Sequence, residues 1–272
     1  MSYTSGIDIG STYTKAVVLG EDSEIAGSSM IKTGFQLEKA ARSTYQSAID
    51  DAGLREEDVD YIIATGFGRH QVSFSHLAVT DLTASARGAK FLYPNTRTVL
   101  DVGGQTMKAS RLDENAKVQS FRLNDKCAAG TGAFLEKTAF YMGYETEEVG
   151  PLVSTSKQPV SISGVCAVFA ESEVINHLSH GSAPADIMHG AVISLVDRSL
   201  QLMKRVRMEP EYTLVGGILK FEKMSDVMHE RLGEGVNVPP KEIVQYVSAI
   251  GAAILGHLRL EKLRDKATAK AT

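Results

Sequence analysis

The sequence predicts an α/β protein of two lobes, and two observations carry this prediction. First, the stretches 3–31 and 97–123 share one plan, in which an apolar strand ends in Asp-x-Gly, a tight turn follows, and the second strand carries a lysine. Second, apolar residues recur at three- and four-residue steps between and after these stretches, as in amphipathic helices. Strand modules and helices that alternate in this way, repeated twice, are typical of a two-lobed α/β protein.

The individual elements follow from the same patterns. Short β-prone runs bounded by glycine or charged turn residues predict strands at 3–10, 14–20 and 23–31, and again at 97–104, 106–112 and 117–123. Apolar periodicity predicts helices over 36–53, 187–206 and 244–258. We therefore expect a first lobe at 1–96, a second lobe at 97–245, and a C-terminal helix, 246–265, that returns to the first lobe.

Composition narrows the class of protein. The chain has 272 residues, 43% of them hydrophobic, and a net charge of −4 without a long basic stretch, so neither nucleic acid nor an anionic membrane is an expected partner. No signal-like leader and no apolar stretch of about 20 residues is present, and the two cysteines are too few for a disulfide scaffold. We expect a soluble cytoplasmic protein.

The first Asp-x-Gly turn has the residue types that bind a nucleotide phosphate. A strand delivers Asp8, whose carboxylate can hold Mg²⁺ through water. Gly10 lets the backbone approach a ligand, and exposed N–H groups in such a turn cradle anionic oxygens. Ser11 and Thr12 add hydroxyl donors, and Lys15 adds a cation.

Three further glycine turns complete the pattern. Asp101, Gly103, Gly104 and Gln105 repeat the first layout, with Lys108 in place of the first lysine. Gly216 and Gly217 end a predicted strand and open a helix, and the run 249–253 places Gly251 inside the C-terminal helix. Any one of these is typical of an ordinary turn. The competing nucleotide signatures, Gly-x-x-x-x-Gly-Lys-Ser/Thr and a complete Gly-x-Gly-x-x-Gly, do not occur.

In this order the four segments resemble the phosphate-1, phosphate-2, adenosine and connect-2 segments of the actin, sugar-kinase and Hsp70 superfamily. The resemblance implies a two-lobed ATPase fold that binds ATP and Mg²⁺ between its lobes. Asp8 and Asp101 would serve the metal ion, and catalysis would consist mainly of neutralising charge and positioning the attacking group. The phosphates would bind Gly10, Ser11, Thr12, Gly103 and Gly104, and the adenosine would approach Gly216 and Gly217. Gln105 is the candidate for orienting a water, which favours hydrolysis over transfer to a sugar.

Each of the two cysteines precedes a predicted helix. Cys127 lies in NDKCAAGTG, and Cys166 lies in SGVCAVFAESE. The positive end of a helix lowers a thiol pKa and favours anions, so we expect Gly130, Thr131 and Gly132 to contribute to cofactor binding. Two thiolates do not complete the four-thiolate shell of an iron–sulfur cluster, but two subunits with two each do. Two isolated cysteines are also typical of buried small hydrophobic residues.

NDKCAAGTG and CAVFAESEVI, together with ATGFGR at 64–69 and DVGGQ at 101–105, resemble the ATPase family that activates 2-hydroxyacyl-CoA dehydratases and drives ATP-dependent benzoyl-CoA reductases. The resemblance implies that Cys127 and Cys166 bind a [4Fe–4S] cluster shared with a homologous ATPase subunit. It also implies that ATP hydrolysis drives single electrons, from ferredoxin or a similar donor, to iron–sulfur subunits that reduce or dehydrate a CoA thioester. Within the family the chain is expected to be closest to the smaller ATPase subunit of benzoyl-CoA reductase.

One position departs from the family pattern, and two other functions stay open. Many members carry Asp where this chain has Thr106, which puts any metal or water role at that position in doubt. An amino-sugar kinase would need a sugar pocket and an aspartate base, and a nucleotide-gated scaffold would need no catalysis; neither has a use for the cysteines. Glu173, His177 and His180 fall at helical spacing, and we interpret them as a polar helix face rather than a metal site.

Overall fold

The computed structural model describes residues 2–124, 131–163 and 167–271. The chain divides into two compact units. Unit 1 comprises Met1–Pro94, Asn115–Val118 and Gln245–Thr272, and unit 2 comprises Asn95–Glu114 and Gln119–Val244. That the chain forms two separate domains divided at 96 and 245 stays a prediction. The two units differ from it in that the short segment Asn115–Val118 belongs to unit 1.

Unit 1 is built on a five-stranded sheet in the order β3-β2-β1-β4-β5. The strands are β1 (Tyr3–Ile9), β2 (Tyr13–Leu19), β3 (Ile25–Lys32), β4 (Val59–Gly66) and β5 (Leu77–Ala78). β1 pairs antiparallel with β2 and parallel with β4. The end of β1 therefore lies between the start of β2 and the end of β4, which brings the Asp8 turn next to two other segments.

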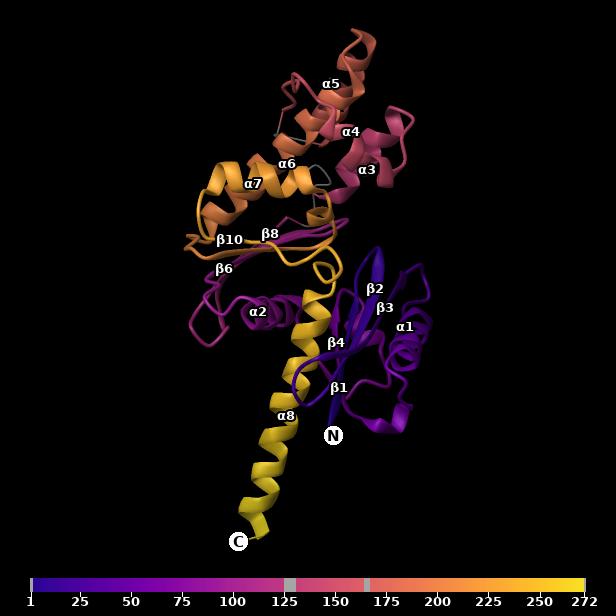
Figure 1. The fold of residues 1–272 in the computed structure, drawn as a ribbon, viewed down its shortest axis with the longest axis vertical. Helices are drawn as coiled ribbons and strands as arrows, with labels where there is room; N and C mark the ends of the chain where they lie inside the picture. The colour runs from indigo at the N-terminus through magenta and orange to yellow at the C-terminus, as the bar shows by residue number, and fades with distance from the viewer. Residues whose placement is uncertain (1, 125–130, 164–166, 272) are drawn as a thin grey trace. The chain divides into compact units, whose positions relative to one another are not determined.

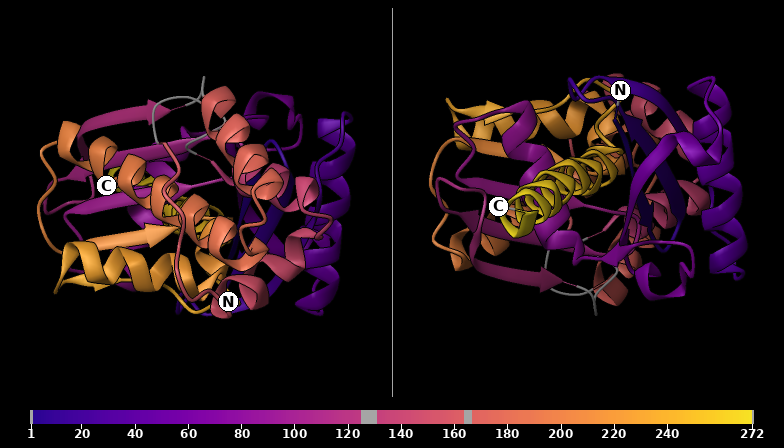
Figure 2. Two further views of the ribbon diagram at one scale, coloured as in Figure 1. Left: turned by 90° about the horizontal axis from the view of Figure 1, so that it is seen from above. Right: turned by 90° about the horizontal axis from the view of Figure 1, so that it is seen from below.

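Helices cover both faces of this sheet (Figures 1 and 2). On one face α1 (Leu37–Asp51) buries Tyr45 and Ile49 against Ile7 and Ile9. The alternate residues of β1 face the other way, toward α8 (Val247–Ala271), which lies beside α2 (Asp81–Leu92). α8 passes close because Gly6 has no side chain: a Cβ there would lie 1.9 Å from the Ala249 carbonyl oxygen.

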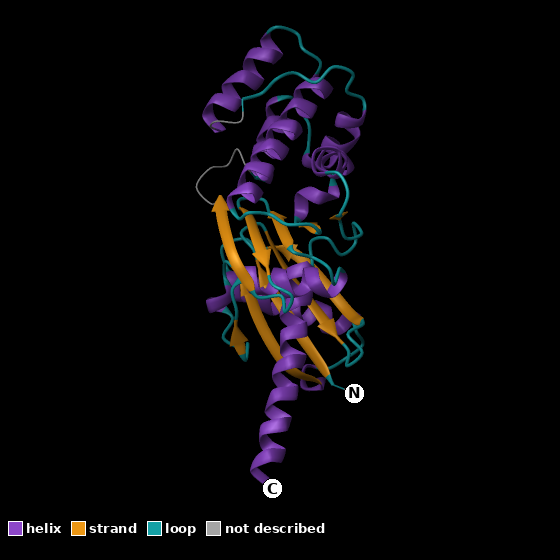
Figure 3. Cartoon of the chain, turned by 90° about the vertical axis from the view of Figure 1, so that its left-hand side faces the viewer, coloured by secondary structure: helices purple, strands orange, loops and turns teal. Residues whose placement is uncertain are grey.

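The two remaining helical turns of unit 1 are short, and α8 is long. The turns are η1 (Glu56–Asp58) and η2 (Arg69–Gln71). α8 extends beyond the sheet of its own unit, and residues 261–269 are exposed (Figure 3). None of the helices in the described part of the chain has the length and apolar character of a membrane-crossing segment.

Unit 2 repeats the strand plan of unit 1. Its sheet has the order β10-β9-β6-β7-β8. The strands are β6 (Thr98–Val102), β7 (Met107–Leu112), β8 (Val118–Asn124), β9 (Tyr212–Val215) and β10 (Val236–Asn237). β6 pairs antiparallel with β7 and parallel with β9, as β1 does with β2 and β4. This equivalence confirms that the two β-rich stretches of the sequence are related modules.

The core of unit 2 forms around α6 (Pro184–Arg205), whose apolar face packs on β7 and on the neighbouring helices. Proline suits the first position of this helix because its missing N–H would have no partner there. The other helical elements are α3 (Gly132–Tyr141), η4 (Thr146–Glu148), α4 (Val149–Ser154), α5 (Ala167–Ser179), η5 (Gly217–Lys220) and α7 (Glu222–Leu232). The helices predicted over 36–53, 187–206 and 244–258 are confirmed as α1, α6 and α8.

Candidate functional site

Asp8 and Lys15 face each other across the first hairpin. They are register partners on β1 and β2, and Lys15 Nζ lies 3.1 Å from Asp8 Oδ2. The side chains of Lys15 and Asp8 are only 14% and 12% exposed, respectively, so water screens this pair less than a surface pair. A carboxylate at a strand end with a cation beside it is suited to a ligand that combines a metal ion with phosphate oxygens.

The turn after Asp8 is closed by backbone hydrogen bonds. Gly10 N–H donates to the Tyr13 carbonyl oxygen at 3.1 Å, and a Cβ on Gly10 would lie 2.8 Å from that oxygen. Thr33 braces the turn from the end of β3, since its hydroxyl donates to Gly10 O and its N–H donates to Thr12 O. Ser11 remains exposed at the tip. The turn is therefore rigid, with its tip open to a ligand.

Gly66 completes this corner, although it is not among the site residues predicted from the sequence. Its φ of +86° favours glycine, and a Cβ there would lie 2.4 Å from Asp8 Oδ1. Next to it, Gly68 N–H donates to Ile9 O at 3.0 Å, and Arg69 Nη1 donates to Gly66 O at 3.0 Å. Arg69 therefore braces the corner. The sequence signal for Gly66, Gly68 and Arg69 was the glycine-rich run 64–69, which spans the end of β4.

The second Asp turn has the same construction. Asp101 and Lys108 are register partners on β6 and β7, with 3.6 Å between Lys108 Nζ and Asp101 Oδ2. Gly103 N–H donates to Thr106 O at 2.8 Å, as Gly10 does to Tyr13. Thr106, the residue that departs from the family pattern, thus contributes its backbone to the turn.

Gly216 takes the place that Gly66 has in unit 1. Its φ is +102°, and a Cβ would lie 2.8 Å from Asp101 Oδ1 and 2.4 Å from Val102 O. The Asp101 carboxylate and the Val102 backbone therefore require a glycine at position 216, independently of any ligand. Gly217 follows as the first residue of η5, and Gln105 is exposed beside the second turn.

The start of α3 is tied to the second Asp turn. Gly132 N–H donates to Gly103 O at 3.0 Å, and Ala133 N–H donates to Gly104 O at 2.8 Å. Gly132 also allows close approach, since a Cβ would lie 3.3 Å from Gly104 Cα. These two N–H groups therefore bind the turn itself rather than a ligand. Thr131, at the N-cap, is fully buried.

The cysteines lie outside the described residues, and so does Gly130, but the segment that leads to Cys166 is anchored to α5. Glu173 accepts a hydrogen bond from Ser163 N–H, and His177 Nε2 lies 3.2 Å from Ser161 O. His180 instead contacts Asn176 O in its own helix. Glu173 and His177 thus hold the chain just before Cys166, a structural role that the spacing of the sequence did not reveal.

Asp186, in the first turn of α6, holds the chain slightly earlier. Its Oδ1 accepts hydrogen bonds from Gln158 N–H, the Ser156 hydroxyl and Lys157 N–H, at 2.8–2.9 Å. The pKa of the Asp186 carboxyl is held below its usual value by these hydrogen bonds, and the bond from Gln158 N–H contributes most. Burial lowers the pKa of the neighbouring His189, whose Nδ1 lies 3.0 Å from Ser156 Oγ.

The residues present fit a hydrated Mg²⁺ better than a directly ligated metal. Across the described residues, no three His, Cys, Asp or Glu side chains come together as a ligand set. Asp8 and Asp101 instead stand singly, each near the end of a strand and next to a turn that a backbone hydrogen bond from Gly10 or Gly103 closes. Mg²⁺ retains most of its waters and needs only one or two carboxylates when a phosphate supplies other oxygens.

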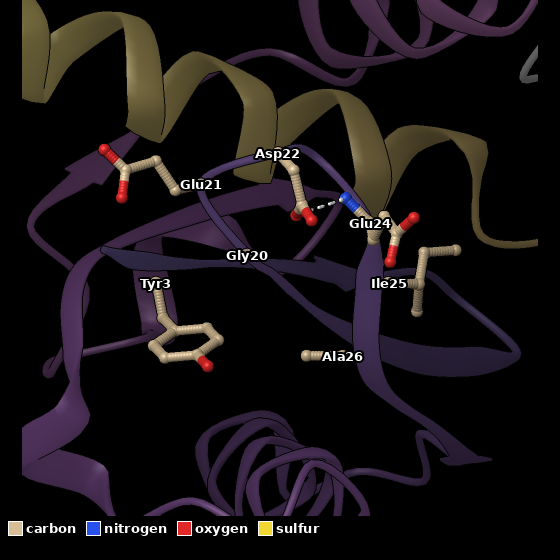
Figure 4. Close-up of a pocket in the computed structure, with 7 residues that line it drawn as sticks. All are labelled: Tyr3, Gly20, Glu21, Asp22, Glu24, Ile25 and Ala26. Atoms are coloured by element: carbon tan, nitrogen blue, oxygen red, sulfur yellow. Dashed lines mark hydrogen bonds between the residues drawn. The ribbon is translucent and has the colours of Figure 1, made fainter. Parts of the chain in front are cut away.

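A pocket of about 530 Å³ lies elsewhere in unit 1 (Figure 4). It is formed around the start of β1, the turn after β2 and the start of β3, by Tyr3, Gly20, Glu21, Asp22, Glu24, Ile25 and Ala26. Because Asp8 is near the other end of β1, this pocket is separate from the Asp8 turn. Its three carboxylates would repel phosphate, so it is not a nucleotide site.

Comparison with known proteins places the chain in a family. A sequence model of the BadF/BadG/BcrA/BcrD ATPase family matches residues 5–256. The 2-hydroxyisocaproyl-CoA dehydratase activator of Clostridioides difficile is 37% identical over 93% of this chain and 94% of its own length. One of the benzoyl-CoA reductase subunits of Thauera aromatica is 34% identical over 97% of this chain and 96% of its own length.

Solved structures support the same assignment. The activator of the 2-hydroxyisocaproyl-CoA dehydratase from Clostridium difficile with bound ADPNP has a TM-score of 0.89 and 35% identity, over 97% of each chain. A ROK family glucokinase from Streptomyces griseus has a TM-score of 0.60 at 15% identity, over 94% of this chain and all of its own, and shows the fold alone. The predicted actin, sugar-kinase and Hsp70 fold is confirmed. With the family match over nearly its whole length, this chain belongs to the BadF/BadG/BcrA/BcrD ATPase family.

Proposed function

We propose that this protein is an ATP-hydrolysing activator that delivers single electrons to an iron–sulfur enzyme acting on a CoA thioester. Membership of the family supports the ATPase, and its relatives, activators of CoA-thioester dehydratases and a CoA-thioester reductase subunit, support the partner class. The observation that carries the proposal is the match of residues 5–256 to this ATPase family. The pair of hydrogen bonds that ties α3 to the Gly103–Gly104 turn supports a route for the coupling.

The two Asp turns serve one ATP·Mg²⁺ in this proposal. Asp8 and Asp101 hold the metal through its waters, and Lys15 and Lys108 neutralise charge beside them. The phosphates bind Gly10, Ser11, Thr12, Gly103 and Gly104, and the adenosine binds against Gly216 and Gly217. Gln105 orients the attacking water. Because these groups position and neutralise rather than react, hydrolysis needs no covalent intermediate on the protein.

The tie between α3 and the second turn is the route by which nucleotide state reaches the cysteine segment. The carbonyl oxygens of Gly103 and Gly104 accept hydrogen bonds from the start of α3. In this proposal the same turn also binds phosphate. A change in the turn on hydrolysis therefore displaces the N-terminus of α3, together with Thr131 and Gly132. The segment that contains Cys127 and Gly130 joins α3 at this point in the sequence.

Cys127 and Cys166 are proposed as the ligands of a [4Fe–4S] cluster completed by two cysteines of a homologous ATPase subunit. Such a cluster carries one electron at a time, with a potential that depends on nearby dipoles and solvent. In this chain, Glu173 and His177 hold the segment before Cys166, and α5 begins directly after it. Ferredoxin or a similar donor supplies the electron, and iron–sulfur subunits receive it.

The CoA substrate is proposed from two candidates. The stretch YTLVGGILKFE at 212–222 resembles the smaller ATPase subunit of benzoyl-CoA reductase, which favours benzoyl-CoA. The dehydratase activators among the relatives favour a 2-hydroxyacyl-CoA. The identities of 34% and 37% give neither candidate precedence. Since the thioester reacts on the partner enzyme, an assay that offers the protein with each partner separates the two.

Iron content tests the proposal directly. The protein is purified without oxygen, alone and with any homologous subunit, and iron and acid-labile sulfide are measured for wild type, Cys127→Ala and Cys166→Ala. We expect about four irons per pair of subunits in the wild type and loss of iron in both variants, with ATP binding retained. ATPase activity without iron would contradict the electron-transfer role, and phosphorylation of a sugar that survives both cysteine substitutions would make the protein a kinase.

A further inference from the structure

A buried hydroxyl beside Asp8 lacks a hydrogen-bond partner in the described part of the chain. Thr65, on β4, is fully buried, and its Oγ1 contacts no donor or acceptor among those residues. An unpaired buried hydroxyl destabilises a fold, so buried polar groups are nearly always hydrogen-bonded. Its position beside Asp8 makes it a candidate for a partner that arrives with the ligand.

Thr65 and Asp8 lie side by side on one face of the first sheet. They are register partners on the parallel strands β4 and β1. Gly6 and Ile63, two residues before each of them, both face α8, and side chains alternate along a strand, so Asp8 and Thr65 face the same way. Asp8 Oδ2 is bound to Lys15, whereas Oδ1 leans toward β4, over Gly66. The available carboxylate oxygen is thus on the Thr65 side.

The equivalent position in unit 2 shows that packing does not require this hydroxyl. Val215 pairs with Asp101 and precedes Gly216, just as Thr65 pairs with Asp8 and precedes Gly66. Valine and threonine have nearly the same shape and differ by the hydroxyl. The same corner therefore forms with an apolar side chain, and the Thr65 hydroxyl has a use specific to the Asp8 side.

We propose that Thr65 is a positioning residue for the metal of the nucleotide. A water of the Mg²⁺ hydration shell donates one hydrogen bond to Asp8 Oδ1 and the other to Thr65 Oγ1, which fixes the water against the carboxylate. Mg²⁺ is bound in proteins largely through such retained waters. This inference rests on the proposed function, because it requires that Asp8 serve the Mg²⁺ of ATP.

The test compares Thr65→Val with Thr65→Ser and with the control Thr4→Val. Thr4 is also fully buried on β1 and faces α8, but its hydroxyl donates to Ala253 O at 2.8 Å. For each variant, the urea midpoint is measured without nucleotide, and the Mg²⁺ concentration for half-maximal thermal stabilisation is measured with ADP present. ATPase activity is then titrated with Mg²⁺.

Thr65→Val is expected to keep or raise the urea midpoint while it raises the half-maximal Mg²⁺ concentration about tenfold, the effect of one lost hydrogen bond near a charge. Thr65→Ser restores the wild-type Mg²⁺ response. Thr4→Val lowers the urea midpoint and leaves the Mg²⁺ response unchanged. An unchanged Mg²⁺ response in Thr65→Val, or a fall in its urea midpoint as large as that of Thr4→Val, overturns the inference. A wild-type protein with neither Mg²⁺-dependent stabilisation nor ATPase activity would refute the proposed function instead.

Discussion

At the scale of single residues, the two Asp corners depend on glycines from elsewhere in the chain: Gly66 ends β4, and Gly216 directly follows β9. Gly66 and Gly216 have positive φ angles, and a Cβ added to them would lie 2.4 Å from Asp8 Oδ1 and 2.8 Å from Asp101 Oδ1, respectively. A side chain at either position would displace the carboxylate from the turn. These glycines therefore determine where the carboxylate points, although neither has a group that takes part in chemistry.

Replacing Gly66 with alanine is expected to abolish ATPase activity and to destabilise the protein. Gly53→Ala is the matched control, because Gly53 also has a positive φ of 65° but nothing lies within 4 Å of its added Cβ. Both variants lose about 1–2 kcal/mol from the left-handed backbone, and Gly66→Ala loses more through its contact with Asp8. Urea unfolding and ATPase assays measure the two effects. Equal losses of activity in the two variants would show that the corner does not matter.

At the scale of elements, glycines let α8 pack backbone to backbone with its neighbours. A Cβ on Gly251 would lie 1.9 Å from Ala84 O of α2, and one on Gly88 would lie 2.0 Å from Val247 O. With Gly6 on β1, these residues let α2, α8 and the sheet approach more closely than side chains would permit. Gly251, chosen from the sequence as the connect-2 glycine, thus has a packing role inside unit 1.

Gly251→Ala is expected to destabilise the protein by about 3 kcal/mol, because the added methyl group meets backbone atoms that cannot move without separating α8 from α2. Gly150→Ala on α4 is the control. There the nearest atom to the added Cβ is 3.7 Å away, so the methyl group meets no clash and the free energy of unfolding should change by less than about 1 kcal/mol. Both changes are read from urea unfolding curves. A neutral Gly251→Ala would mean that the helices can separate at little cost.

At the scale of the whole molecule, two units of one design perform different tasks. Each provides an Asp, a Lys and a glycine corner with the same strand register. They differ in what surrounds the corner: unit 1 has the Thr65 hydroxyl, and unit 2 has Val215 and the tie to α3. In our proposal unit 1 positions the metal's waters, and unit 2 passes the nucleotide state to the cysteine segment.

If both carboxylates serve one metal ion, their substitutions should not add. Asp8→Asn and Asp101→Asn are each expected to lower kcat for ATP hydrolysis about a hundredfold, and the double variant should be no worse than the more damaged single variant. Asp22→Asn, a pocket residue near the other end of β1, should retain activity. ATPase rates at saturating Mg²⁺ measure all four variants. Multiplied losses in the double variant would mean that the carboxylates act independently.

Local features of the fold and the site could be predicted because they depend on residues close in sequence. The seven-residue spacing from Asp8 to Lys15, repeated from Asp101 to Lys108, places each pair across one hairpin. Helical periodicity identified α1, α6 and α8 for the same reason. The cysteine segments stay a prediction, since Cys127 and Cys166 lie outside the described residues.

The sequence by itself determined the two strand modules, the order of the glycine turns and the family, since each is written in contiguous residues. Only the tertiary structure decided which distant segments meet them: Gly66 and Thr65 beside Asp8, Gly216 beside Asp101, and Gly132 against Gly103. The physical reason is that parallel strand pairing and helix docking join residues far apart in the chain, and their register depends on the packing of the whole unit.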